Sequence, residues 1–270
     1  MNDSVNSSWQ STFQEIGRPL VDTTFVVIDL ETTGGAPHLG AGITEIGAVK
    51  ICRGEVVAEF ETFIDPGHPI PSYITDLTGI TDEMVFQSPT IAAVFPSLLE
   101  FLGSPEKTVL VAQNAPFDLS FLTYAARVNA FPWPKFPVLD TAIIARKVLT
   151  RDEVPNCKLG TLAQFFGTET TPNHRALDDA RATVDVFHGL LERLGSHDIY
   201  TLEELNNFAG KFFPNVAHLQ ILPVSYFAIF EWKGDGHRIF GVGTMNGGKH
   251  QGTIFSGSAN RSYFVHGPAE

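Results

Sequence analysis

Two almost uninterrupted apolar segments constrain the fold of this chain more than any other feature. They are TTFVVIDL at residues 23–30 and KTVLVA at residues 107–112. A strand with one wet face alternates apolar and polar residues, whereas a continuous apolar run indicates a strand that is covered on both faces. We therefore expect a layered α/β domain with these two segments at the centre of its sheet.

The remaining segments complete this pattern. ITEIGAVKIC (43–52) and EVVAEFETFI (55–64) are rich in β-branched residues and are separated by Arg53-Gly54, which predicts a β-hairpin. Apolar spacing and capping residues predict helices near residues 81–84, 90–102, 116–129, 140–149, 158–166 and 176–194. This order of elements predicts a mixed central sheet flanked by helices.

Changes in composition along the chain predict four parts. Residues 1–20 are rich in Ser, Asn and Gln and are expected to form a flexible arm. The α/β domain is expected to span residues 21–196, followed by a helical linker at residues 197–220. Residues 221–270 are rich in Gly and aromatic residues, which predicts a small β-rich accessory segment.

The composition indicates the cellular compartment in which the chain is expected to work. Hydrophobic residues make up 43% of the chain, which is enough for a sizeable core. Cys52 and Cys157 are too few for a disulfide framework or a zinc site, so a reduced, cytoplasmic setting is expected. An early basic-then-apolar stretch and a run of about 18 apolar residues are both lacking, which predicts neither a signal peptide nor a membrane partner.

The charge is strongly acidic but uneven. A net charge of −12 argues against bulk binding of nucleic acid through a basic surface. Residues 201–270 hold equal numbers of basic and acidic side chains, so the first 200 residues carry the whole excess of negative charge. Eight basic residues fall between Arg127 and Arg181. These residues predict either a locally positive face or an ordinary solvated helix face.

Two carboxylates occur at the end of the first apolar run. Asp29 and Glu31 are two residues apart, so a strand places them on the same face. Side by side in a buried strand they repel each other and lose hydration, and a bound divalent cation removes that cost. The alternative is that the strand ends near Leu30 and that Glu31 faces solvent.

Three further candidate site residues lie near the ends of predicted elements, and each of them alone could have an ordinary structural role. Asp118 and Asp179 fall in first turns of predicted helices, where acidic residues are common, and His174 precedes a helix as a solvated loop residue can. Together with the first pair, however, they place hard ligands around one core, which suits Mg²⁺ or Mn²⁺. Two such ions about 3.5–4 Å apart can act on a phosphodiester, and a histidine can take a proton from water.

Three motifs then stand in order along the chain. They are DLETTG (29–34) followed by ITEIGAVKI (43–51), QNAPFD (113–118) followed by LSFL, and HRALDDA (174–180) with the pattern His-x-Ala-x-x-Asp. The PGHPIP, LTGITDEMV and KLGTLAQFFG segments agree with the same pattern. Over about residues 23–195 the chain resembles the DnaQ-like, DEDDh-type 3′→5′ exonucleases, which implies a ribonuclease H-like fold.

The resemblance implies a role for each catalytic position. Asp29, Glu31 and Asp179 would hold the more tightly bound of two metal ions, and Asp29 with Asp118 would hold the second. His174 matches the general base of the family. At the end of the third motif, Asp179 rather than its neighbour matches the last ligand.

The resemblance also implies substrate contacts. Thr32 and Thr33 would meet the 3′-terminal nucleotide, and Asn114 and Phe117 would shape the pocket beside it. Gln113 stands where many members carry His, outside the metal ligands, so contacts to the strand are expected to differ while catalysis is retained.

The implied reaction releases nucleoside 5′-monophosphates from the 3′ end of single-stranded or frayed DNA in repair. Proofreading inside a DNA polymerase complex and trimming of RNA 3′ ends by the same chemistry are the alternatives, because attack at a 3′ end needs no 2′-hydroxyl. A non-enzymatic nucleic-acid binding module is opposed by the acidic charge and would leave the carboxylates unexplained. The sequence indicates no oligomeric state.

The tail faintly resembles a second family. ILPVSYFAIFEWKGDGHRIFGVGT (221–244), with strands expected at 224–232 and 237–243, is similar to the start of a GIY-YIG nuclease domain of the UvrC type. ANRSYF (259–264) is similar to a later piece. YFAIF and FGVG replace the signature tyrosine elements, which implies a degenerate or accessory β module rather than a second catalytic site. The alternative is a small β-rich tail that packs on the exonuclease or binds a partner.

Overall fold

The chain forms two compact units, residues 1–214 and 215–270. The computed structural model describes residues 17–209 with their side chains and, in the second unit, the backbone of residues 227–234, 237–246, 249–256 and 259–264. Of the predicted arm and linker, residues 1–16 and 210–220 therefore lie outside the described residues.

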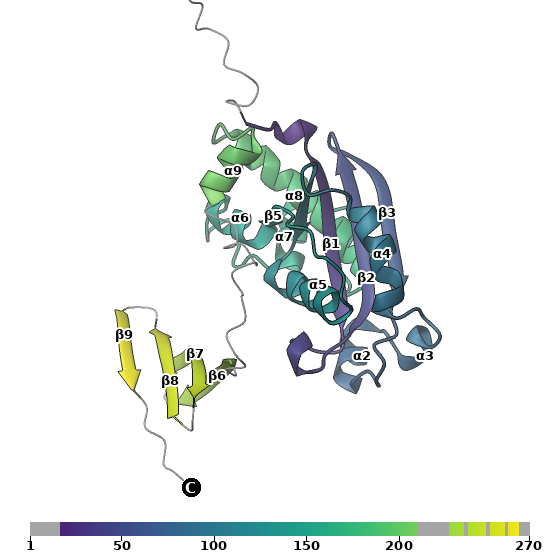
Figure 1. Cartoon of the computed structure of the whole chain (residues 1–270). Coiled ribbons are helices and arrows are strands. Elements are labelled where there is room, and N and C mark those ends of the chain that lie inside the picture. Colours follow the sequence, from purple (N-terminus) through teal and green to yellow (C-terminus); the bar gives the residue numbers. More distant parts are fainter. Residues whose placement is uncertain (1–16, 210–226, 235–236, 247–248, 257–258, 265–270) are drawn as a thin grey trace, which may run out of the picture. The chain divides into compact units, whose positions relative to one another are not determined.

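The first unit is built on a five-stranded mixed sheet, as predicted (Figure 1). The strand order is β3-β2-β1-β4-β5, and β1 runs antiparallel to β2 and parallel to β4. The strands are β1 (Thr24–Thr32), β2 (Ile43–Cys52), β3 (Glu55–Phe63), β4 (Thr108–Ala112) and β5 (Val138–Asp140). The helices are α2 (Ser72–Thr78), α3 (Asp82–Val85), α4 (Ile91–Leu102), α5 (Pro116–Val128), α6 (Thr141–Val148), α7 (Leu159–Phe166), α8 (Ala176–Gly195) and α9 (Leu202–Ala209).

Helices cover both faces of the sheet, which confirms the interpretation of the apolar run in β1. Val27 lies in a buried cluster with Phe187 of α8, whereas Val26 and Ile28 lie in a second buried cluster with Phe121 of α5. Alternate residues of a strand point to opposite faces, so β1 separates the two clusters. In Figure 1, α4 and α5 lie on the near side of the sheet and α8 on the far side.

The predicted hairpin is confirmed at its turn. Arg53 and Gly54 both have positive φ, +55° and +81°, between β2 and β3. Two consecutive residues of this kind match the twist of antiparallel strands and favour a two-residue connection. The pair therefore sets the register of β3 on β2 next to the turn.

Two elements near the site, β5 and α2, escaped prediction because they are short. β5 has three residues and follows the proline-rich segment 132–137, which hides the strand signal. α2 has seven residues, of which only Ile74 and Thr78 are buried, so no helical periodicity accumulates. Both nevertheless border the site described below.

Residues at the edges of the predicted domain contact one another. Leu20 donates its N–H to the carbonyl of Tyr200 at 2.9 Å, and Leu202 donates to the carbonyl of Arg18 at 2.9 Å. Leu202 and Leu205 of α9 are buried in the cluster on the α8 face of the sheet. Residues 17–20 and α9 are thus packed onto the first unit.

The second unit contains an antiparallel meander in the order β6-β7-β8-β9. Its strands are β6 (Phe227–Gly234), β7 (His237–Asn246), β8 (Lys249–Ser256) and β9 (Ala259–Phe264). β6 and β7 lie where strands were expected, and residues 221–226 lie outside the described residues. Among the helices that the structure describes, none has the length and apolar character needed to cross a membrane.

Candidate active site

The site begins at the carboxyl end of β1. Asp29 stands opposite Gly47 of β2, and Glu31 stands opposite Glu45. The register of β1 against β2 shifts directly after Glu31, which locally ends regular pairing. Asp29 and Glu31 lie on one face of the strand, as expected, and Glu31 is 8% exposed rather than turned to solvent.

Gly47 allows α8 to approach this face. A Cβ atom on Gly47 would lie 2.2 Å from the backbone of Ala176 and Leu177 in the first turn of α8. We predict that Gly47→Ala lowers the free energy of unfolding by about 1–3 kcal/mol, because backbone atoms must move to admit the methyl group. Chemical denaturation would measure the change. Gly160→Ala in α7 is the control, since nothing lies within 4 Å of its Cβ position, and equal stability of the two variants would contradict the close approach.

The turn from β4 into α5 brings in Asp118. Its Oδ1 accepts the N–H of Leu30 at 3.1 Å, and the residue is 3% exposed. Asn114 has a positive φ of +64° in this turn, and the carboxylate of Asp140 accepts its N–H at 3.3 Å. Asp140 also accepts the N–H of Ala142 at 2.9 Å, so one buried carboxylate caps α6 and holds the turn. The bond to Leu30 holds Asp118 close enough to the two acids of β1 for their charges to interact.

The segment before α8 brings in His174 and Asp179. His174 is exposed and has a φ of +60°, whereas Asp179 is 7% exposed and its Oδ1 accepts the N–H of Asn173 at 2.9 Å. Ligand atoms of Glu31, His174 and Asp179 all lie within 4.8 Å of one another. Residues from two distant motifs therefore meet at one point.

A pocket of about 360 Å³ joins these groups. Eight of the nine sequence-predicted site residues line it: Asp29, Glu31, Thr32, Asn114, Phe117, Asp118, His174 and Asp179. Thr33 does not line the pocket. Its hydroxyl accepts the N–H of Gly42 at 2.9 Å and its own N–H donates to the Gly42 carbonyl at 2.8 Å, so Thr33 ties down the loop after β1.

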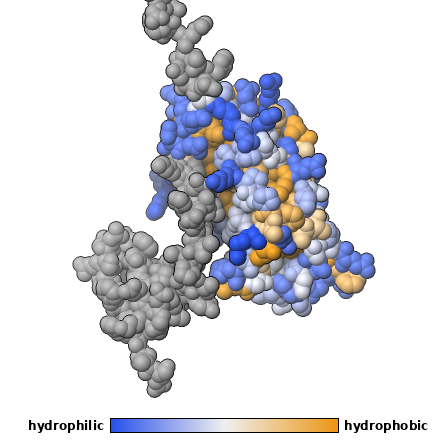
Figure 2. Space-filling view, in the orientation of Figure 1, coloured by the Kyte–Doolittle hydropathy of each residue, from blue (hydrophilic) through white to orange (hydrophobic). Residues whose placement is uncertain are grey.

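Sequence reasoning missed Tyr73 and Leu77, which also line the pocket. They are 64% and 53% exposed and lie one helical turn apart on α2. Figure 2 shows apolar residues scattered among hydrophilic ones on the viewed face, which is ordinary for a protein surface. Tyr73 and Leu77 differ from scattered cases because both border the same pocket. Their spacing in SYITDLT was the available signal, but α2 itself was not predicted.

Gln113, the departure from the usual motif, lines the pocket while its side chain is held in place. Its Nε2 donates to the carbonyl of Cys157 at 2.7 Å, and its Oε1 accepts from the hydroxyl of Thr141. Neither bond involves a carboxylate of the site. Gln113 therefore connects the pocket wall to α6 and to the segment before α7.

The carboxylates raise one another's pKa. Burial raises the pKa of Asp29 well above its ordinary value, and the charge of Asp118 adds to the shift. Burial, followed by the charges of Asp179 and Glu45, raises the pKa of Glu31 to about 8. Burial also raises the pKa of Asp118 and of Asp179. The site thus concentrates negative charge that is costly to keep buried.

This donor set fits a divalent metal ion. The donor atoms available in the pocket are carboxylate oxygens and one imidazole, with no thiolate among the residues lining it. Such hard donors prefer Mg²⁺ or Mn²⁺. The positive charge of Arg175 lowers the pKa of Glu31, but it offsets only part of the increase because its guanidinium is bonded to Glu45. A bound cation would relieve the remaining repulsion.

The fold and the site together define a nuclease built on a ribonuclease H-like sheet. The sequence profile of the RNase_T family, described as exonuclease, matches residues 26–187, so the chain belongs to this DnaQ-like exonuclease family. The match ends before the second unit, and nothing in it supports the resemblance of residues 221–264 to a GIY-YIG domain.

Similar proteins include longer chains. A protein of Mycobacterium tuberculosis (strain CDC 1551 / Oshkosh), whose name describes a bifunctional exonuclease/endonuclease, is 50% identical over 206 residues, covering 74% of this chain and 31% of the relative. The PolC-type DNA polymerase III of Caldanaerobacter subterraneus subsp. tengcongensis is 43% identical over 183 residues, covering 68% and 13%. The chain thus spans less than a third of the length of these relatives.

Solved structures share the fold. Exonuclease X in complex with 5′-overhanging duplex DNA superposes with a TM-score of 0.54 at 25% identity, covering 69% of this chain and 99% of the other. The nuclease domain of 3′hExo, a DEDDh family member bound to rAMP, gives a TM-score of 0.52 at 20% identity, covering 63% and 92%. These superpositions agree with the predicted ribonuclease H-like sheet.

Proposed function

We propose that this chain is a metal-dependent 3′→5′ exonuclease that removes nucleoside 5′-monophosphates from single-stranded or frayed DNA. The observation that carries the proposal is the convergence of Asp29, Glu31, Asp118, His174 and Asp179 on one pocket. Membership of an exonuclease family supports the reaction class. The DNA-bound exonuclease among the structural relatives supports the choice of nucleic acid.

Two divalent ions, Mg²⁺ or Mn²⁺, are proposed for the acidic cluster. Asp29, Glu31 and Asp179 would hold one ion, and Asp29 with Asp118 would hold the second. The ions, when bound, supply positive charge that stabilises the attacked phosphate and the leaving oxygen. The raised pKa values of Asp29 and Glu31 support this assignment, because the cluster has more negative charge than its protein neighbours neutralise.

His174 is proposed as the general base. Its imidazole would accept a proton from the attacking water as the new phosphorus–oxygen bond forms. The bond to the 3′-oxygen of the remaining strand then breaks, and that oxygen takes a proton from solvent. The exposure of His174 at the pocket supports this role, because the proton it accepts must return to bulk water.

We predict that His174→Gln lowers kcat by about 10²–10⁴-fold, the usual contribution of a general base. The wild-type rate should rise between about pH 6 and 8, where histidine side chains typically titrate, and the residual rate of His174→Gln should not. A pH–rate profile at saturating Mg²⁺ measures both. A flat wild-type profile, or a variant with the wild-type slope, would argue against this base.

The 3′-terminal nucleotide is proposed to enter the pocket alone. A volume of about 360 Å³ is at the lower end of small-ligand sites, so a base pair does not fit and a duplex end must open first. Thr32, Asn114 and Phe117 would contact this nucleotide, and Thr33 would support them through its bonds to Gly42.

Tyr73 and Leu77 are proposed to contact the terminal base from α2. We predict that Tyr73→Ala raises KM about 5- to 150-fold with a smaller effect on kcat, since stacking on an aromatic ring is worth about 1–3 kcal/mol per base. Steady-state kinetics on a short oligonucleotide measure the split. Tyr200→Ala is the control, because Tyr200 is 60% exposed and does not line the pocket. Equal KM values for the two variants would remove Tyr73 from the substrate site.

Proofreading within a polymerase is the second candidate function, and the PolC-type relatives favour it. RNA 3′-end trimming uses the same chemistry. A polymerase or repair partner is proposed on the same basis, in a cytoplasmic setting to which the free cysteines Cys52 and Cys157 are suited.

The test uses 5′-labelled single-stranded DNA and RNA of equal sequence with Mg²⁺, Mn²⁺ or EDTA. We expect a metal-dependent ladder that shortens from the 3′ end, with the DNA shortened faster. A faster RNA ladder would reassign the substrate. Cleavage only after addition of a polymerase complex would favour proofreading, and release of the 5′ label first would contradict the proposed polarity.

A further inference from the structure

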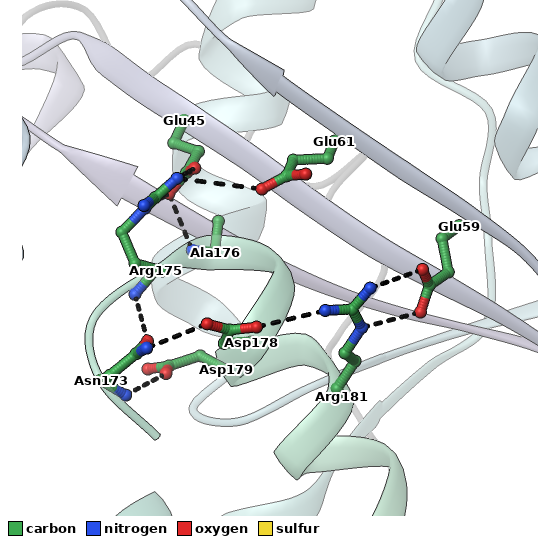
Figure 3. A network of polar contacts seen from close by, with 9 residues as sticks. All are labelled: Glu45, Glu59, Glu61, Asn173, Arg175, Ala176, Asp178, Asp179 and Arg181. Carbon is green, nitrogen blue, oxygen red and sulfur yellow. Dashed lines mark hydrogen bonds and ion pairs between the residues drawn. The ribbon is translucent and has the colours of Figure 1, made fainter. Parts of the chain in front are cut away.

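The first residue of α8 is capped from a neighbouring strand. Arg175, at the N-cap position, makes no side-chain cap. Instead the Oε2 atom of Glu45 in β2 accepts the N–H of Ala176 at 2.9 Å (Figure 3). A free N–H at a helix start otherwise needs a local side chain or water. Glu45 therefore fixes the start of the helix that carries Asp179.

The guanidinium of Arg175 binds the same carboxylate. Its Nε lies 3.1 Å from both oxygens of Glu45, and its Nη2 lies 2.7 Å from Oε1. The guanidinium also lies over the ring of Phe63, with Cζ 5.2 Å from the ring centre. A paired guanidinium of this kind has a fixed plane and direction. Arg175 therefore fixes the backbone on the C-terminal side of His174, where α8 begins.

Asn173 holds the other side of His174. Its N–H donates to Oδ1 of Asp179 at 2.9 Å, and its own Oδ1 accepts the N–H of Arg175 at 3.1 Å. Between these bonds His174 adopts a φ of +60°, which residues other than glycine seldom adopt. Such a conformation persists where the surroundings enforce it. Figure 3 shows the bonds of Asn173 and Arg175, the two neighbours of His174 in the chain.

The negative charge of Glu45 destabilises the sheet, which a neutral capping residue would not do. It stands opposite Glu31 across the β1–β2 pair, is 0% exposed, and its charge raises the pKa of Glu31. Like charges directly opposite in a sheet are destabilising. Glutamine could cap Ala176 without that repulsion, but it could not hold the guanidinium of Arg175 as an ion pair. The retained charge therefore indicates a role beyond capping.

We infer that Glu45 and Arg175 are positioning residues, which act as one unit to place His174 and Asp179 against Glu31. The inference rests on the proposed function, because it assigns these two residues to the geometry of that site. Neither side chain lines the pocket. Their effect on the reaction passes through the backbone of His174 and the first turn of α8.

A second ion pair provides a matched control. Arg181 of α8 donates to both carboxylate oxygens of Glu59 in β3, at 2.8 and 2.7 Å. This pair also joins the α8 segment to the sheet through a guanidinium and a carboxylate, although the Glu59 side chain is 36% exposed and that of Glu45 is 0% exposed. Glu59 makes no contact with the segment 173–176 among its hydrogen bonds or ion pairs. Arg181 also donates to Asp178, which accepts from the side chain of Asn173. Glu59→Gln therefore removes an ion pair while it leaves in place the bonds to the backbone N–H groups of Asn173, Arg175 and Ala176.

The experiment compares Glu45→Gln, Arg175→Lys, Arg175→Gln and the double variant Glu45→Gln/Arg175→Gln with Glu59→Gln. We expect kcat on single-stranded DNA to fall about 10- to 100-fold in the first three, at nearly unchanged KM, as for loss of outer groups that orient metal ligands. The double variant should be no worse than either single variant, because the pair acts as a unit. Glu59→Gln should keep the wild-type kcat.

Hydrogen exchange of the metal-free proteins provides the readout that does not require activity. Amides of residues 173–180 should exchange at least several-fold faster in Glu45→Gln and Arg175→Lys, and at the wild-type rate in Glu59→Gln. Wild-type kcat in Arg175→Lys, or unchanged exchange in both variants, would overturn the inference. If the wild-type protein cleaves no substrate, the proposed function fails, while the exchange rates still decide whether the pair orders this segment. Arg175 is one-third exposed, so its variants remain informative if Glu45→Gln fails to fold.

Discussion

Asp29→Asn is expected to reduce cleavage by about 10³-fold or more. Asp29 is the one side chain proposed to contact both ions, and the positive charge that they supply is worth several kcal/mol in the transition state. Asparagine has nearly the same volume, so the pocket keeps its shape, but its amide is a far weaker ligand for a hard cation. Single-turnover rates with Mg²⁺ and Mn²⁺ would measure the loss.

The same substitution is expected to stabilise the metal-free protein at pH 8. Burial and the charge of Asp118 oppose ionisation of Asp29, and they raise its pKa well above the ordinary value. A neutral amide removes that repulsion. Asp185→Asn is the control, because Asp185 lies on α8 and accepts the N–H of Glu169 away from the pocket. A variant that is both inactive and less stable than Asp185→Asn would indicate damage to the fold rather than loss of a ligand.

Thermal stability of the metal-free protein is expected to fall as pH rises from about 5 to 8. The pKa of Glu31 is raised from 4.5 to about 8, so the folded state binds more protons than the unfolded state across this interval. A raised folded-state pKa gives stability that is complete below the unfolded pKa and is lost as pH rises through the folded value. At about 1.4 kcal/mol per pKa unit, the loss amounts to a few kcal/mol, or on the order of 10 °C in Tm.

Other shifted carboxyls do not reverse this trend. Arg181 lowers the pKa of Glu59, and hydrogen bonds lower the pKa of Glu153 and of Glu204. A lowered folded-state pKa gives stability that is already present above the ordinary range near 4.5, so these groups contribute little slope between pH 5 and 8. The acidic cluster therefore governs that interval.

Divalent metal should restore stability mainly at the alkaline end. At pH 8 the carboxylates are free to bind Mn²⁺, whereas at pH 5 protons compete for the same oxygens. Circular dichroism melts of EDTA-treated protein with and without Mn²⁺, taken at several pH values, measure both effects. A Tm that rises with pH in EDTA, or a Mn²⁺ shift that is equal at pH 5 and pH 8, would contradict a cluster of buried, mutually repelling acids.

The sequence predicted the central architecture because its signals there are long. Nine residues of β1 and twenty of α8 carry enough apolar pattern to mark two layers, and Arg53-Gly54 marks the hairpin without ambiguity. The short elements β5 and α2 carried too few residues for a period to show. Tyr73 and Leu77 were missed with α2, since a side chain can be placed at a site only when its element is known.

The candidate site was predicted as a set of residues but not as a geometry. Asp29 and Glu31 share a face by strand alternation alone, whereas Asp118 reaches them through one bond to the N–H of Leu30. Thr33 is adjacent to a pocket residue in sequence, yet the loop turns its hydroxyl to Gly42. Glu45 gave no signal, because its partner lies 130 residues away in the chain. Such long-range pairs depend on packing that local patterns do not encode.

Calorimetric titration of metal-free protein with Mn²⁺ tests the central claim most directly, because it requires neither substrate nor partner. At pH 8, in the presence of a nucleoside 5′-monophosphate, we expect binding of two ions by the wild-type protein and by Asp185→Asn. Asp118→Asn should retain the site formed by Asp29, Glu31 and Asp179, and Asp29→Asn should lose both. Binding that is absent from the wild-type protein, or unchanged in Asp29→Asn, would contradict the proposal that these carboxylates form the metal site.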